Sequence, residues 1–161
     1  LGDTQPTNTV FTTTGAWQSA GVTMIGYSWV PIPGFSKFGS YIGTGTSNFI
    51  YTGFRPRWLM IKRSVANSSP DTSTASTSWG VWDTATKTYN GLTGKALWAN
   101  SDVAQGYRGD NSSTSSLGDI EVDILSNGFY MDGPGSENNA NTGAYLYAAF
   151  AAHPFKTTRA F

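Results

Sequence analysis

The residues best suited to chemistry lie within "GDIEVDIL" (118–125), where the carboxylates of Asp119, Glu121 and Asp123 alternate with aliphatic side chains. Successive residues of a β-strand point to opposite faces, so these three carboxylates would share one face at spacings of about 6.5–7 Å. A retaining glycosidase needs two carboxyl groups about 5–5.5 Å apart, one as nucleophile and the other as acid. The spacing is therefore close to that required for glycosidic-bond hydrolysis.

Two features of the same row favour a structural interpretation. The β-sandwich glycosidases with such a row carry Glu-x-Asp-x-Glu, whereas this chain has Asp-x-Glu-x-Asp, which puts the shorter side chains at the two chemical positions. A strand with one face in the core and the other in water shows the same alternation without any catalytic role. We therefore predict that the row is the solvent face of a strand and that the protein is not an enzyme; a β-sandwich glycosidase is the least favoured alternative.

Carboxylates elsewhere could supply oxygen ligands to calcium, namely those of Asp119, Asp123, Asp132 and Glu137. They lie in no compact Asp/Asn/Gly loop of the EF-hand kind, and scattered acids are the better interpretation. Cysteine is absent and His153 is the only histidine, which removes thiolate and multi-histidine zinc sites. We predict no metal site and no cofactor.

Aromatic side chains near polar loops are the candidates for ligand binding. The rings of Tyr89, Trp98 and Tyr107 could stack on sugars, and Arg108 could bind anionic groups. Packing beneath a loop is the alternative role for each ring. Two further indoles, Trp79 and Trp82, are predicted to lie on opposite faces of one strand.

Composition excludes several classes of function. Basic and acidic residues balance at 10 each and charged residues make up 12% of the chain, with no basic stripe that could follow a phosphate backbone, so we expect no nucleic-acid partner. No run approaches the roughly 18 apolar residues of a membrane span, so we expect no membrane insertion. No signal peptide is recognisable. Nineteen glycines and 14% aromatics, with Ser, Thr and Asn between apolar runs, favour β-structure with long polar loops.

Short β-rich runs separated by turn residues predict an all-β fold, either a sandwich or a barrel, with long polar loops. The apolar run 58–61 predicts a central strand that is covered on both faces, and Asn127-Gly128 predicts a tight hairpin. The only helical turn is expected around 94–101. The expected strands are 9–14, 22–30, 37–43, 48–54, 57–63, 79–84, 118–125, 128–133 and 144–151.

Three blocks of the chain, "GFSKFGSYIGTGTSNFIYTGFRPRWLMIKR" (34–63), "DILSNGFYM" (123–131) and "AYLYAAFAAHPF" (144–155), resemble a domain of unknown function that recurs in tailed phages, especially marine ones. The resemblance covers roughly residues 22–155, with the blocks in family order. It implies an antiparallel, jelly-roll-like β-sandwich of the concanavalin or SPRY kind, often repeated at the C-terminal end of large virion proteins. It brings no catalytic residues. The loops 64–78 and 106–116 are longer here and richer in Ser and Thr.

From this resemblance we expect a structural or attachment module on the surface of an extracellular phage particle: a tail fibre, an adhesin or a capsid surface decoration. Its expected partners are copies of itself, other virion proteins and host cell-surface polysaccharide. A dedicated lectin-like carbohydrate-binding domain and a subunit of a non-viral extracellular filament are the alternatives.

The chain divides into a sandwich domain at 34–161 and an N-terminal strand segment at 1–33. This segment is either the remnant of a preceding repeat or an arm that adds to a sheet. Left unpaired, it would expose five apolar side chains, and exposed apolar strand edges aggregate unless another sheet takes them up. We therefore expect it to add to a sheet of its own domain or of a neighbouring copy. The five residues are Val10, Phe11, Ile25, Tyr27 and Trp29.

Overall fold

The computed structural model describes residues 26–64, 78–86, 96–100, 121–135 and 137–154, together with residues 7, 9, 10, 23 and 105. The chain forms two compact units, Leu1–Val30 and Pro31–Phe161. All the strands described below belong to the second unit.

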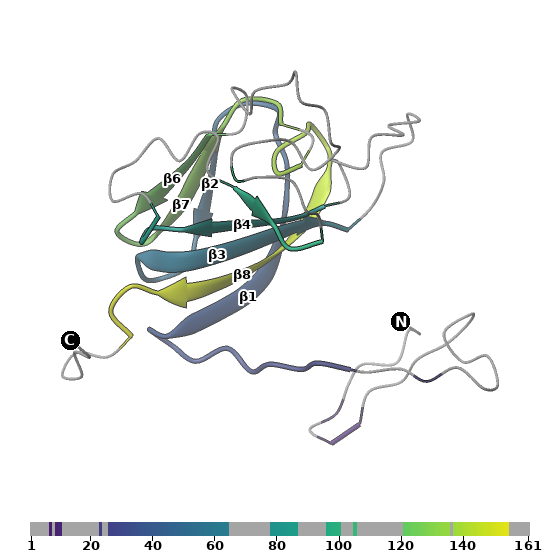
Figure 1. Ribbon diagram of the computed structural model, residues 1–161, viewed down its shortest axis with the longest axis vertical. Helices are drawn as coiled ribbons and strands as arrows, with labels where there is room; N and C mark the ends of the chain where they lie inside the picture. Colours follow the sequence, from purple (N-terminus) through teal and green to yellow (C-terminus); the bar gives the residue numbers. More distant parts are fainter. Residues whose placement is uncertain are drawn as a thin grey trace. The chain divides into compact units, whose positions relative to one another are not determined.

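The second unit is built from two antiparallel sheets, and its described residues contain no helix (Figure 1). In the five-stranded sheet the order is β1 (Ser36–Ile42), β8 (Ala144–Ala151), β3 (Pro56–Arg63), β4 (Trp79–Asp83) and β5 (Leu97–Trp98). In the three-stranded sheet the order is β2 (Asn48–Tyr51), β7 (Gly128–Asp132) and β6 (Glu121–Leu125). The predicted all-β, antiparallel class is therefore confirmed. Within the described part of the chain, no helix has the length and hydropathy needed to cross a membrane.

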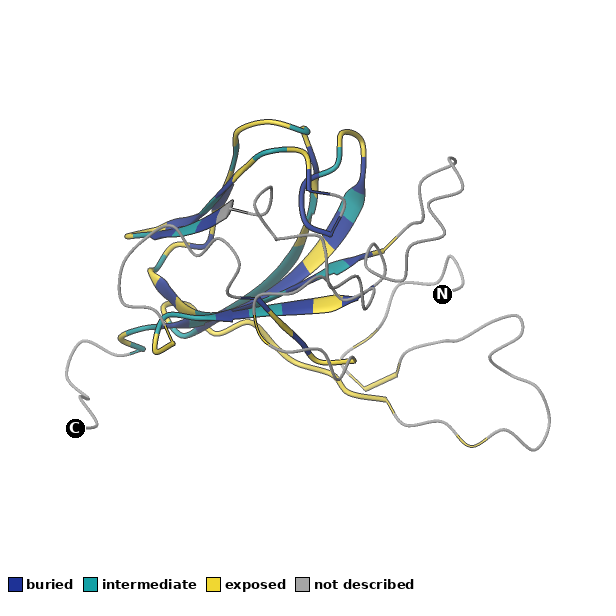
Figure 2. Cartoon of the chain, turned by 45° about the horizontal axis from the view of Figure 1, so that its top comes forward, coloured by how far each residue is buried: buried dark blue, intermediate teal, exposed yellow. Residues whose placement is uncertain are grey.

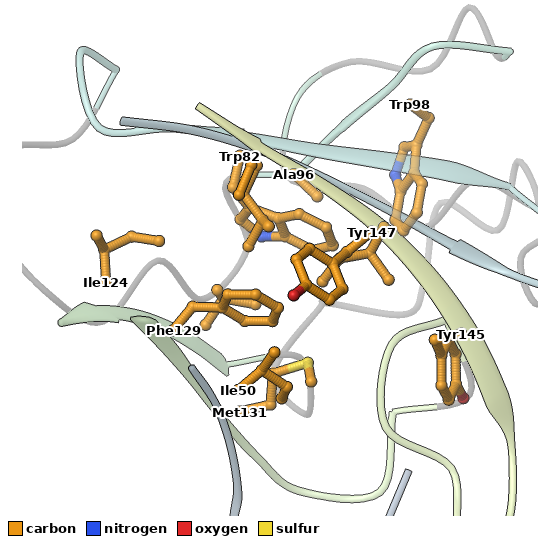
Figure 3. Close-up of a cluster of buried hydrophobic side chains, with 13 residues drawn as sticks. Ile50, Trp82, Ala96, Trp98, Ile124, Phe129, Met131, Tyr145 and Tyr147 are labelled. Atoms are coloured by element: carbon orange, nitrogen blue, oxygen red, sulfur yellow. The ribbon is translucent and has the colours of Figure 1, made fainter. Parts of the chain in front are cut away.

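The two sheets share one hydrophobic cluster, to which each contributes alternate residues of its strands (Figures 2 and 3). This alternation follows from the two-residue period of a strand, which sends one set of side chains inward and the other outward. Packing of two sheets through their inner faces is a sandwich-like arrangement. The five-stranded sheet contributes Leu59, Ile61, Trp82, Trp98, Tyr145, Tyr147 and Ala149, and the three-stranded sheet contributes Ile50, Val122, Ile124, Phe129 and Met131.

The prediction that residues 57–63 form a central strand is confirmed, because β3 lies between β8 and β4. Leu59 and Ile61 point into the cluster and are 0% and 1% exposed. Trp58 and Met60 lie on the opposite face and are only half-buried. The prediction that both faces of this strand are covered is therefore wrong for the outer face, and only the inner face is fully buried.

The strand predicted at 22–30 is wrong for the residues that can be described, because residues 26–30 are not in a strand. Tyr27 and Trp29 are 74% and 62% exposed, and their rings stack with centroids 6.0 Å apart. No described ladder contains a residue before Ser36, so the structure does not show this segment adding to a sheet of its own domain. A β-prone sequence forms a strand only where it finds a partner. Phe11 and Ile25 lie outside the described residues.

The helical turn predicted around 94–101 is also wrong, because Leu97 and Trp98 form the short strand β5 beside β4. Gly80 makes this pairing possible. A Cβ atom at Gly80 would lie 2.6 Å from the Trp82 ring and 3.1 Å from the Trp98 ring. The absence of a side chain at position 80 lets both indoles enter the core, where they meet edge to face at 6.4 Å.

The predicted hairpin at Asn127-Gly128 is confirmed, since β6 and β7 pair with Leu125 opposite Gly128 and leave a two-residue turn. The role of the glycine differs from the one expected. Gly128 is not among the described residues with positive φ. A Cβ atom there would instead lie 2.2 Å from the carbonyl oxygen of Ile50 on β2. The glycine allows the close approach of β2 and β7.

Replacement of Gly128 by alanine is therefore expected to destabilise the domain by about 1–3 kcal/mol or more, because a backbone atom must move to admit the methyl group. Urea unfolding followed by circular dichroism measures this cost. Ser126→Ala, in the exposed turn of the same hairpin, is the control and should leave the midpoint almost unchanged. Equal midpoints for the two variants would contradict the close approach.

The side chain of Asn139, which is 0% exposed, connects two segments of the chain at one end of the two-sheet domain through hydrogen bonds. Its Oδ1 accepts hydrogen bonds from the Thr44 N–H at 3.1 Å and from Asn48 Nδ2 at 3.2 Å. Its Nδ2 donates to the carbonyl oxygens of Gly133, at 2.9 Å, and of Thr46. The amide thus joins the β1–β2 connection to the segment that follows β7.

Candidate functional site

The five-stranded sheet turns a broad apolar face away from the core, which we call the outer apolar face. Four of its side chains are well exposed: Ile42 (60%), Trp79 (42%), Leu97 (44%) and Leu146 (51%). The ladder registers place them on one face of five adjoining strands. Contiguous apolar surface of this kind marks interaction sites. The remaining apolar members of the face are Phe38, Trp58, Met60, Val81, Ala144, Ala148 and Phe150.

An aromatic cluster supports one end of this face. Phe150 on β8 meets Phe38 on β1 and Trp58 on β3, at centroid distances of 5.8 Å and 5.5 Å and with the rings edge to face. Phe35, just before β1, meets Phe150 at 5.8 Å in the same manner. Interlocked rings lose little conformational freedom when a partner covers them, so the surface is preorganised for contact.

Two charged residues, Lys62 and Asp83, lie on the face among its described residues, and both are engaged locally. Lys62 Nζ lies 5.9 Å from the centre of the Trp79 ring and donates to the Arg63 carbonyl oxygen at 3.0 Å. Partial burial lowers the pKa of Lys62. Asp83 Oδ1 accepts a hydrogen bond from the Ala85 N–H at 2.7 Å. Both described charges of the face are thus engaged within the domain.

Asp123, the member of the predicted carboxylate row whose side chain is described, lies on the outer side of the three-stranded sheet. Val122 and Ile124 are 0% and 1% exposed in the core, while Asp123 between them is half-buried on the opposite face. Glu121 pairs with Asp132 of β7 in the ladder. Asp119 lies outside the described residues. The alternation of acidic and aliphatic residues is therefore that of a half-buried strand.

The three described carboxylates weighed as calcium ligands, those of Asp123, Asp132 and Glu137, do not form one group. Asp123 and Asp132 lie on the outer side of the three-stranded sheet, whereas Glu137 is only 2% exposed in the segment between β7 and β8. Within the described ranges, no group of three or more His, Cys, Asp or Glu side chains is close enough to hold a metal ion.

Trp98 does not serve as a sugar-stacking ring, and that expectation is corrected. It is 4% exposed, because pairing of β5 with β4 turns its indole into the core. The prediction that Trp79 and Trp82 lie on opposite faces is confirmed: Trp82 is 2% exposed and Trp79 42%. The other loop candidates, Tyr89, Tyr107 and Arg108, lie outside the described residues.

Exposed aromatic rings occur instead on the outer side of the three-stranded sheet, which sequence reasoning missed. Phe49 and Tyr51 on β2 are 46% and 58% exposed, and Tyr130 of β7 lies directly opposite Phe49 in the ladder. We call these three residues the aromatic platform. The alternation in "NFIY" (48–51), with Ile50 as its inward residue, is the signal that could have revealed them.

A family model described as a domain of unknown function, DUF7483, matches residues 1–154. No curated protein matches the chain, and no solved structure matches it. The matched range contains all eight described strands and therefore both outer surfaces.

Proposed function

Since the chain belongs to the DUF7483 family, a domain of unknown function, we propose a function from its own surface: it is a structural and attachment module of a phage particle. The observation that carries the proposal is the outer apolar face of the five-stranded sheet. Through this face the domain docks onto copies of itself and onto other virion proteins. The viral setting is supported by the resemblance of residues 34–63, 123–131 and 144–155 to a tailed-phage domain.

The energetics of the outer apolar face favour docking. Apolar surface removed from water stabilises an interface by about 25 cal/mol per Å². The cores of protein interfaces are depleted of charge and enriched in Trp, Phe and Met. The outer apolar face has both properties, with Trp58, Trp79, Phe38, Phe150 and Met60 among its members. Because virion proteins occur in many copies, modest contacts would suffice for a stable assembly.

The finer architecture belongs to the same proposal. A jelly-roll-like sandwich of the concanavalin or SPRY kind supplies rigidity from its core alone. Its location would be the extracellular surface of the particle, as a tail fibre, an adhesin or a capsid surface decoration. Mass spectrometry of purified particles, with peptides from residues 34–63 as the marker, tests this location.

Self-association of the domain is expected to weaken by more than about tenfold in the Leu146→Asp variant. The substitution places a charge on β8, an interior strand of the five-stranded sheet, where docking would remove it from water. Sedimentation velocity over a range of concentrations measures the change. Phe49→Ala, on the other sheet, is the control and should associate like the wild type.

A wild-type chain that stays monomeric at every concentration, and that fails to co-sediment with particles lacking it, would contradict the assembly role. Equal association of the wild type and Leu146→Asp would show that another surface carries the contact.

A further inference from the structure

We propose that the aromatic platform of Phe49, Tyr51 and Tyr130 binds neutral pyranose oligosaccharides. Aromatic rings with one exposed face accept the apolar C–H face of a sugar ring, while polar groups at their rim hold its hydroxyls. Phe49 and Tyr130 are directly opposite in the β2–β7 ladder, so their side chains start about 4.5–5.5 Å apart. Tyr51 follows along the same face of β2, about 6.5–7 Å from Phe49. This spacing offers places for successive sugar rings.

The platform is held in place by its surroundings. Gly128 lies opposite Tyr51 in the ladder. The Phe49 ring packs over this glycine, since a Cβ atom at position 128 would lie only 2.9 Å from Phe49 Cε2. Lys37 Nζ lies 5.1 Å from the centre of the Tyr51 ring and donates to the Tyr51 carbonyl oxygen at 2.8 Å. Rings fixed before the ligand arrives lose little conformational entropy on binding.

The charges beside the platform disfavour an anionic ligand, because two carboxylates lie along it and the nearby cation of Lys37 is already engaged with the ring and carbonyl oxygen of Tyr51. Asp123 lies opposite Tyr130 in the β6–β7 ladder, and Asp132 lies two residues along the same face of β7. Asp132 is exposed, and its Oδ1 accepts hydrogen bonds from the Gly133 N–H at 3.1 Å and from Ser47 Oγ at 3.5 Å. Carboxylates accept hydrogen bonds from sugar hydroxyls and repel the anionic groups of acidic polysaccharides and nucleic acids.

The position of the platform also fits a role in display. The two sheets pack through their inner faces, so their outer faces point away from each other (Figure 1). A domain docked through the outer apolar face would leave the aromatic platform uncovered. The sugar site is nevertheless a separate inference, since the isolated domain should bind sugar whether or not it assembles.

The test uses saturation-transfer-difference NMR of the whole chain with three neutral glucose hexamers, namely maltohexaose, cellohexaose and laminarihexaose. Hexameric oligogalacturonate serves as the acidic comparison. At least one neutral hexamer should receive transfer and the acidic one should receive much less. Phe49→Ala should weaken the binding that is seen by about tenfold, by loss of one stacking ring. Leu146→Asp, on the opposite outer face, should bind sugar like the wild type.

Each other outcome overturns the proposal. Absence of transfer to all three neutral hexamers refutes a neutral-sugar site, and stronger transfer to the acidic hexamer refutes the role given to Asp123 and Asp132. If Phe49→Ala weakens self-association instead, the platform is a protein interface. Because Phe49→Ala could alter folding, Tyr51→Ala is measured in parallel, and the melting temperature of each variant is recorded. Unchanged binding in both variants places the sugar elsewhere.

Discussion

The Ile61→Asp variant is expected to be unfolded in water at neutral pH. Ile61 is 1% exposed and lies on the inner face of β3, the middle strand of the five-stranded sheet. Its ladder partners are Tyr147 on β8 and Gly80 on β4. An unpaired carboxylate at this position costs several kcal/mol in addition to the lost apolar contacts. A domain of this kind has only about 5–15 kcal/mol of stability in total.

Far-UV and near-UV circular dichroism with a thermal melt measures this outcome, and Leu146→Asp provides the matched control. Leu146 lies on the outer apolar face, is 51% exposed and is opposite Lys62 in the β3–β8 ladder. A carboxylate there stays in water beside a cation, so the isolated variant should melt close to the wild type. A cooperative melt of Ile61→Asp near the wild-type midpoint would show that this strand does not border the core.

The Asn139→Asp variant is expected to lose about 2–4 kcal/mol of stability, although the two side chains have nearly the same shape. The amide Nδ2 of Asn139 donates to two carbonyl oxygens, those of Gly133 and Thr46. In aspartate an oxygen occupies the position of this donor and faces both carbonyl oxygens while buried. Repulsion between these oxygens would loosen the β1–β2 connection.

Urea unfolding of Asn139→Asp at several pH values separates this mechanism from a loss of packing. Burial raises the pKa of the new carboxyl in the folded state, and its protonated form can donate to one carbonyl oxygen. The variant should therefore approach the wild type as the pH falls and lose stability as the pH rises through the raised pKa. Asn141→Asp, at an exposed position, is the control. A pH-independent difference would contradict the role of the donor.

The strands of this fold were largely predictable because their signal is local. Residues 144–151 were expected as a strand and form β8 with the same bounds. The turn signal at Asn127 located the β6–β7 hairpin. Alternation around Asp123 indicated its half-buried strand. Each of these features depends only on residues that are close together in the sequence, so the sequence alone is enough to predict it.

The features that sequence reasoning missed depend on distant partners. Strand β5 has two residues, too few to show the alternation of a strand. Trp98 can enter the core only because Gly80, which has no side chain, leaves space for its ring. Tyr27 and Trp29 have the composition of a strand but pair with no described ladder. The aromatic platform required knowledge that β2 pairs with β7, which places Phe49 beside Tyr130. Pairing order is set by the whole chain and not by any one segment.

The position of β8 between β1 and β3 has a consequence for synthesis of the chain. The ladder that joins Ser36 to Phe150 links early and late segments, and such distant pairings fold slowly because a long loop must close first. During synthesis, β1 and β3 leave the ribosome before β8, the strand that lies between them in the sheet. Until β8 is synthesised, the edges of β1 and β3 that will pair with it remain unpaired, and unpaired strand edges tend to aggregate. The complete five-stranded sheet therefore cannot form until residue 151 has been synthesised.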